Sequence, residues 1–144
     1  MSGREPILVA LFNLLIGPAG FRTTGRRVKP LTIVSEYPAL FLRHTGDNVA
    51  PRATRMPPIV TINCEAWIYS TAGATPTVAP DTALNGLLDA VETALRPGPA
   101  FDAQTLSGLV THCWIEGQID IHPGDLDGVA IAIVPMSILC PNTL

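Results

Sequence analysis

Two glutamates, each two positions from a tryptophan, are the residues of this chain that come nearest to a catalytic arrangement. Glu65 precedes Trp67, and Glu116 follows Trp114. Paired carboxylates beside aromatic rings are typical of grooves that cleave or bind sugars, where the two carboxyls share acid, base and nucleophile roles. No third acid or polar shell accompanies them in the sequence. Aromatic rings set among charges are also typical of protein interfaces, and the sequence favours that interpretation.

A second set of residues has the types that bind metal ions. His112, Asp120 and His122 fall on one side of an expected strand, and Asp125 and Asp127 follow in a segment with turn residues. The first three are spread over a long strand, so a turn explains the pattern better than a metal site. The chain also has no glycine-rich phosphate loop, no GxSxG elbow and no Cys–His signature. We therefore expect no catalytic residues, no cofactor, no metal and no enzyme activity.

Basic residues are concentrated near the start of the chain. The first 55 residues hold eight basic and three acidic side chains, a net charge of +5, and the remainder holds one and nine, a net charge of −8. Four of the cations lie close together, namely Arg22, Arg26, Arg27 and Lys29. They could contact phosphates of passing DNA without reading its sequence, or a neighbouring subunit of opposite charge. The net charge of −3 argues against sequence-specific nucleic-acid recognition.

The composition is that of one apolar domain. The chain has 144 residues, 15% of them charged, and a mean hydropathy of +0.34. No run approaches the roughly 20 apolar residues that cross a bilayer, so we expect no membrane partner and assign part of the apolar excess to contacts between subunits. Three isolated cysteines, Cys64, Cys113 and Cys140, indicate a reducing compartment.

The elements that position these residues follow from hydrophobic spacing and from turn residues. Helices are predicted over 4–16 and 80–95. Strands are predicted over 21–28, 38–44, 59–70, 106–122 and 128–140, with a loop over 46–58. This order predicts an α+β fold, a mostly antiparallel sheet of about five strands with two helices packed on one face. In the last strand the apolar alternation changes phase at Pro135, which predicts a bulge or an edge position.

Alternation in two of these strands separates a core face from a second face. In 59–70 the apolar residues fall on even positions, and in 109–122 they fall on odd positions, namely Leu109, Cys113, Ile115, Ile119 and Ile121. The opposite positions carry the aromatic and charged residues, which are Glu65, Trp67, Tyr69, His112, Trp114 and Glu116. We predict that another protein covers this second face, and that Arg52 and Arg55 of the 46–58 loop also lie in an interface.

Six segments, in order, resemble the tail terminator (minor tail) proteins of siphophages and of related tail-like and gene-transfer particles. They are ALFNLLIG, FRTTGRRV, YPALFLRHTGD, TALNGLLDAVETAL, LSGLVTHCWIEG and DLDGVAIAIVPMSILCP. The resemblance implies an α+β virion protein that forms a hexameric ring, caps the tail tube and joins the head-completion or connector protein. It also implies assembly in the host cytoplasm and residence in the virion tail or neck. The family has no fixed interface motif, so no residue role is carried over.

Two other interpretations stay open at this point. The chain could be another neck or head-completion protein, which shares the same need for several interaction surfaces. It could also be a small carbohydrate-acting enzyme or binder that uses Glu65 and Glu116.

Overall fold

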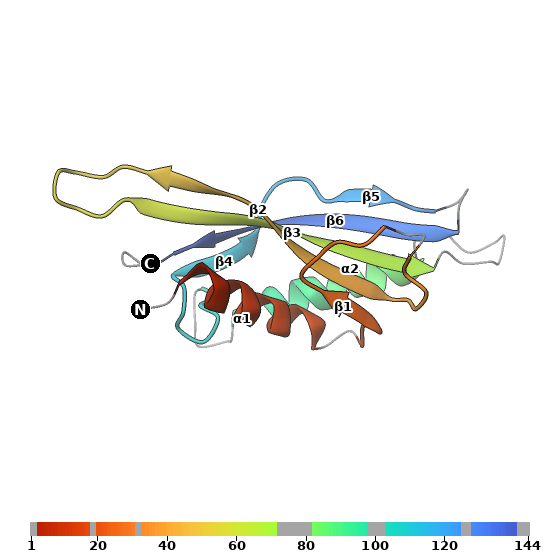
Figure 1. Cartoon of the computed structure of the whole chain (residues 1–144). Helices are drawn as coiled ribbons and strands as arrows, with labels where there is room; N and C mark the ends of the chain where they lie inside the picture. Colours follow the sequence, from red (N-terminus) through yellow and green to blue (C-terminus); the bar gives the residue numbers. More distant parts are fainter. Residues whose placement is uncertain are drawn as a thin grey trace.

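The computed structural model describes residues 3–17, 20–30, 33–71, 82–97, 103–124 and 128–140. In these parts, one six-stranded sheet carries two helices on the same face (Figure 1). The elements in chain order are α1 (Arg4–Ile16), β1 (Thr23–Gly25), β2 (Ala39–Ala50), β3 (Ile59–Thr71), α2 (Thr82–Leu95), β4 (His112–Ile115), β5 (Asp120–His122) and β6 (Val129–Leu139). The α+β class is confirmed.

The sheet is mixed, so the prediction of a mostly antiparallel sheet of about five strands needs correction. Its strand order is β1-β2-β3-β6-β4, and β5 pairs with the same edge of β6 as β4 does. Strand β1 runs parallel to β2, with Thr23 opposite Ala39, while the other pairs are antiparallel. The long connection from β1 to β2 lets the chain return in the same direction, which a hairpin cannot do.

The core face is the one that alternation predicts. In β3 the even positions Ile62, Cys64, Ala66 and Ile68 are at most 1% exposed. Both helices pack on this face, α1 through Ile7, Leu8, Leu11 and Leu15, and α2 through Leu84, Leu88, Val91 and Leu95. The three-to-four-residue spacing of both sets places them on one side of each helix. Within the described part of the chain, neither helix has the length and apolar character to cross a bilayer.

Strand β2 continues through the first five residues of the segment that the sequence predicts to be a loop. Residues 46–50 pair with residues 59–63 of β3, and only 51–58 connect the two strands. The register shifts between His44 and Gly46, and this bulge places Asp47 on the core side of the sheet. There its carboxylate accepts from Arg4 Nε at 2.6 Å and lies 2.7 Å from His44 Nε2. Cross-strand pairing thus overrides the turn preference of Gly46, Asp47 and Asn48.

The predicted strand 106–122 is broken into β4 and β5, and Pro135 explains the break. Strand β6 is central, and its register with β3 is continuous from Leu139 to Val129. The prediction of a bulge or edge position within β6 is therefore wrong. The Pro135 carbonyl accepts from Glu116 N at 3.1 Å. Because the nitrogen and the carbonyl of one strand residue point to the same side, the Pro135 nitrogen, which has no hydrogen to donate, faces the gap between β4 and β5. Gly117, with φ of 102°, forms part of that gap.

Candidate functional site

The second face of the sheet is the surface opposite α1 and α2. Residues directly opposite each other in antiparallel strands point to the same face, so the register fixes its rows. From β3 through β6 to β4 or β5, these rows are Thr61–Leu139–His112, Asn63–Ser137–Trp114, Glu65–Pro135, Trp67–Ile133–Asp120 and Tyr69–Ile131–His122. All six second-face candidates predicted from the sequence lie on it or at its border.

One end of this face is covered by the chain itself. Tyr69 is 2% exposed, and its hydroxyl donates to the Lys29 carbonyl at 2.8 Å. Its ring meets the ring of Phe41 edge-on, with 5.6 Å between centroids. Val34 and partly buried Val28 complete the cluster, so residues of the β1–β2 connection form the cover. The prediction that another protein covers Tyr69 is therefore wrong, and burial raises the pKa of its hydroxyl.

The other end of the face is open and carries polar and aromatic groups. The Trp114 ring is half-buried and stacks on His112, with 5.0 Å between centroids and an angle of 15° between planes. The Ser137 hydroxyl donates to Glu116 Oε2 at 2.9 Å. Glu65 and Glu116 flank Pro135 from opposite sides, which separates their backbones by two strand spacings, about 10 Å. This open end is available to a partner, as are Asp120 and His122 on the β5 edge of the face, which are also exposed.

The two tryptophans do not share a binding groove. Trp67 is opposite Ile133 and Trp114 is opposite Ser137, so four residues of β6, about 13 Å, separate their rows. The Trp67 side chain packs against the covered cluster, and its buried Nε1 has no hydrogen-bond partner among the described residues. The two glutamates therefore lack the shared aromatic wall that a sugar-binding groove would use.

The metal-ligand hypothesis gains no geometric support in the described residues. His112 Nδ1 accepts from the Gln104 backbone N–H at 3.2 Å, and its row on β6 lies far from those of Asp120 and His122. Across the described ranges, no group of three or more His, Cys, Asp or Glu side chains is placed to hold a metal ion. Asp125 and Asp127 lie outside these ranges.

The three cysteines are buried and unpaired. Burial, with a smaller effect of nearby Cys113, raises the pKa of Cys64 to about 12, and burial alone raises that of Cys113 to about 12. Burial also raises the pKa of Cys140. A thiol that stays protonated at neutral pH is a poor nucleophile, so these side chains act as apolar fillers of the core.

The basic residues near the start of the chain do not form one strand. Strand β1 ends at Gly25, so Arg26, Arg27 and Lys29 lie in the connection after it and the predicted strand 21–28 is too long. A guanidinium nitrogen of Arg26 forms an ion pair with the Glu5 carboxylate of α1 at 2.9 Å. Arg22, Arg27 and Lys29 are exposed. Three separate exposed cations therefore remain for contacts with a neighbour or with phosphate.

The end of the β2–β3 hairpin forms an arm, which we define as residues 49–60. Beyond Val60, whose carbonyl accepts from Cys140 N at 3.0 Å, no third strand of the described chain accompanies it. The arm projects past the rest of the molecule (Figure 1). Its exposed apolar side chains are Val49, Met56 and Ile59, at 58%, 52% and 36%. Both predicted loop cations lie near its tip, where Arg52 Nε donates to the Pro57 carbonyl at 2.8 Å and Arg55 has φ of 73°.

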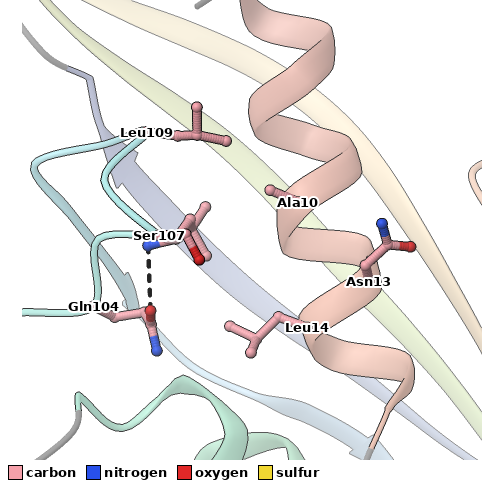
Figure 2. Close-up of a pocket in the computed structure, with 7 residues that line it drawn as sticks. Ala10, Asn13, Leu14, Gln104, Ser107 and Leu109 are labelled. Atoms are coloured by element: carbon pink, nitrogen blue, oxygen red, sulfur yellow. Dashed lines mark hydrogen bonds between the residues drawn. The ribbon is translucent and has the colours of Figure 1, made fainter.

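Sequence reasoning missed Gln104, which organises the turn before β4. Its Nε2 lies within 3.4–3.5 Å of the carbonyls of Ala94 and Leu95, at the end of α2, and of Arg96, which follows the helix. Its Oε1 accepts from Leu106 N at 3.2 Å, in a turn where Leu106 and Ser107 both have positive φ. The turn and α1 border a hollow of about 390 Å³, shown in Figure 2. A lone glutamine between two elements carries no sequence signal of this role.

Comparison with known proteins yields a match in structure only. No protein-family model matches the chain, and no curated protein matches it in sequence. The fold is similar to that of a chain in the "virion of native gene transfer agent (GTA) particle", with a TM-score of 0.55 and 10% sequence identity. The alignment covers 93% of this chain and 93% of that one. The two chains share a fold. Because the match spans nearly the whole of each chain, it concerns the complete arrangement of helices and strands and not a common submotif.

Proposed function

We propose that this chain is a structural protein of a phage-like virion, and more specifically a tail terminator. In this role it forms a hexameric ring that caps the tail tube and then binds the head-completion or connector protein. The observation that carries the proposal is the fold shared over 93% of both chains with a gene transfer agent virion chain. The order of sequence segments that resemble tail terminators supports the finer assignment.

The surfaces of the molecule suit such a role. A ring requires two different patches on each subunit that bind each other head to tail, and stacking on a tube requires a further surface. The open end of the second face, the arm and the exposed cations Arg22, Arg27 and Lys29 are three separate surfaces of different chemistry. If those cations face the lumen of the ring, they attract passing DNA through charge alone.

We also propose that the protein is not an enzyme. Glu65 and Glu116 lie on a sheet surface on either side of Pro135, without an aromatic groove around them. The cysteine thiols are buried and protonated at neutral pH. These groups contribute contacts and packing rather than bond cleavage.

Tube-length control tests the proposal. A tail tube protein from the source genome of this chain is polymerised with and without the purified protein, and tube lengths and ends are measured by negative-stain electron microscopy. We expect ring-capped, shorter tubes in its presence and uncapped, longer tubes without it. A variant of an exposed α2 residue, Asp89→Asn, should cap normally. Tubes of unchanged length with bare ends, at a protein excess over tube ends, would contradict the proposal.

A further inference from the structure

The arm and the open end of the second face are complementary, and we infer that they bind each other between neighbouring copies. In this arrangement Arg52 and Arg55 of one copy face Glu116 and Glu65 of the next. The inference rests on the proposed ring and names the contact that builds it.

Apart from Val60, whose side chain packs against the core and whose carbonyl accepts from Cys140 N, the arm lacks support from other described elements of its own subunit. Beyond Val60 it is a two-stranded ribbon, and no third strand or helix of the described residues lies over it; an isolated hairpin of this kind is marginally stable in water. It nevertheless exposes Val49, Met56 and Ile59. Val49 and Ile59 lie on opposite faces of the ribbon, so each face carries an exposed apolar side chain that contact with a partner would bury.

The tip of the arm has cations without counter-ions. Among the described residues, neither Arg52 nor Arg55 forms an ion pair, although other arginines such as Arg4 and Arg26 do. The two cations are three residues apart, so their backbones are separated by at most about 10 Å. The tip can therefore present two guanidinium groups to a pair of anions at similar spacing.

The open end of the second face provides such a pair. The backbones of Glu65 and Glu116 are about 10 Å apart across Pro135, and neither carboxylate is ion-paired to a described residue. Exposed Arg43 lies opposite Glu65 in the register, so Glu116 is the stronger acceptor of the two. The adjacent Trp114 ring is a suitable contact for Met56, since thioethers pack well against aromatic edges.

The receiving surface must belong to another copy. The arm continues the β2–β3 ribbon away from the molecule and does not fold back over its own second face (Figure 1). The donor and the acceptor are different patches, so the contact is heterologous, and repeated contacts of this type close into a ring when the rotation permits. Opposite charges on the two patches also favour the correct orientation over contacts between like patches.

A reciprocal charge reversal tests the contact. The arm variant R52E/R55E and the face variant E65R/E116R are purified separately, and self-association is measured by light scattering over a concentration series. Each variant alone brings like charges together, so we expect self-association at least roughly tenfold weaker than in the wild type. An equimolar mixture restores opposite charges at every contact and should assemble like the wild type. The milder double variant E65Q/E116Q should lose less self-association than E65R/E116R. It replaces E65R/E116R as the test of the face if that variant fails to fold.

The control is N85E/T93E, which adds negative charge at exposed sites of α2, on the opposite side of the sheet from the second face and away from the arm. It should assemble normally. Full assembly of R52E/R55E, equal loss in the control, or a mixture that stays dissociated would each overturn the inference. So would an arm variant that forms rings but no longer caps tubes, because the arm would then bind the tube. If the wild type neither assembles nor caps tubes, the proposed function fails, and not merely this contact.

Discussion

The two faces of one sheet show different relations between sequence and environment. On the core face, α1 and α2 cover an apolar cluster, in which Ile62, Ala66 and Ile68 are fully buried. On the second face, residues of the β1–β2 connection cover only the end around Tyr69, and the end around Trp114 and Glu116 stays open. Alternation separates the two faces, but it does not reveal whether a face is covered by the same chain or by another one.

Truncation on the core face should have the largest effect on stability. Ile68→Ala removes a fully buried side chain beneath the helices, and we expect a loss of about 2–5 kcal/mol in the free energy of unfolding. Arg43→Ala on the second face of the same sheet is the matched control, since Arg43 is exposed, and it should change stability by less than about 0.5 kcal/mol. Urea unfolding of dissociated protein measures both. Similar losses for the two variants would contradict the assignment of the faces.

The covered end of the second face should show an intermediate effect. Tyr69→Phe keeps the ring against Phe41 but removes the hydroxyl that donates to the Lys29 carbonyl. We expect a loss of about 0.5–1.5 kcal/mol, together with faster hydrogen exchange or proteolysis in the β1–β2 connection. An unchanged exchange pattern would show that this hydrogen bond does not hold the cover in place.

The root of the arm should show the smallest effect, and it depends on pH. Burial disfavours the charged form of Asp47, but hydrogen bonds from His44 and Arg4 outweigh this and hold its pKa below the usual value of 3.8. The folded state therefore gains stability from the carboxylate above the pKa of the unfolded chain and loses it as the pH falls through the lower folded pKa. Because Arg4 is 48% exposed, the contribution is below about 1 kcal/mol.

Unfolding of the wild type and of Asp47→Asn at pH values from 7 to 2 checks this. Below about pH 4, the wild type should lose stability more steeply than the variant. Parallel curves for the two proteins would show that Asp47 does not fix the bulge through its charge.

Regular spacing made parts of the fold predictable. The end of α1 is predicted by Gly17 and Pro18, which follow it in the sequence. The buried positions of β3 are predicted by apolar alternation, because that pattern extends over several residue pairs. The extension of β2 through Asp47 and Asn48 depends on cross-strand pairing and on the contact with Arg4, which are distant in sequence. The break between β4 and β5 depends on Pro135 of a different strand.

The candidate site was predictable in its residues but not in its grouping. The six second-face residues share a surface, as alternation indicates, yet Tyr69 is buried by its own chain and the two tryptophans lie in separate rows. The contact of the β1–β2 connection with Tyr69 of β3 produces no periodic pattern in the sequence of the connection or of β3. The link between Gln104 and the end of α2 is likewise a single side chain with local contacts, which spacing rules do not detect.

Quenching of single tryptophans by acrylamide tests most directly whether a second copy covers the open end of the second face. Trp67→Phe leaves Trp114 as the only indole and removes an N–H that has no described partner, so the fold should be retained. Trp114→Phe leaves Trp67 as the only indole and serves as the matched control. We predict that Trp114 is readily quenched in dilute, dissociated protein and several-fold less so after assembly, while Trp67 changes little. Equal quenching of Trp114 in the dissociated and the assembled protein would contradict the account.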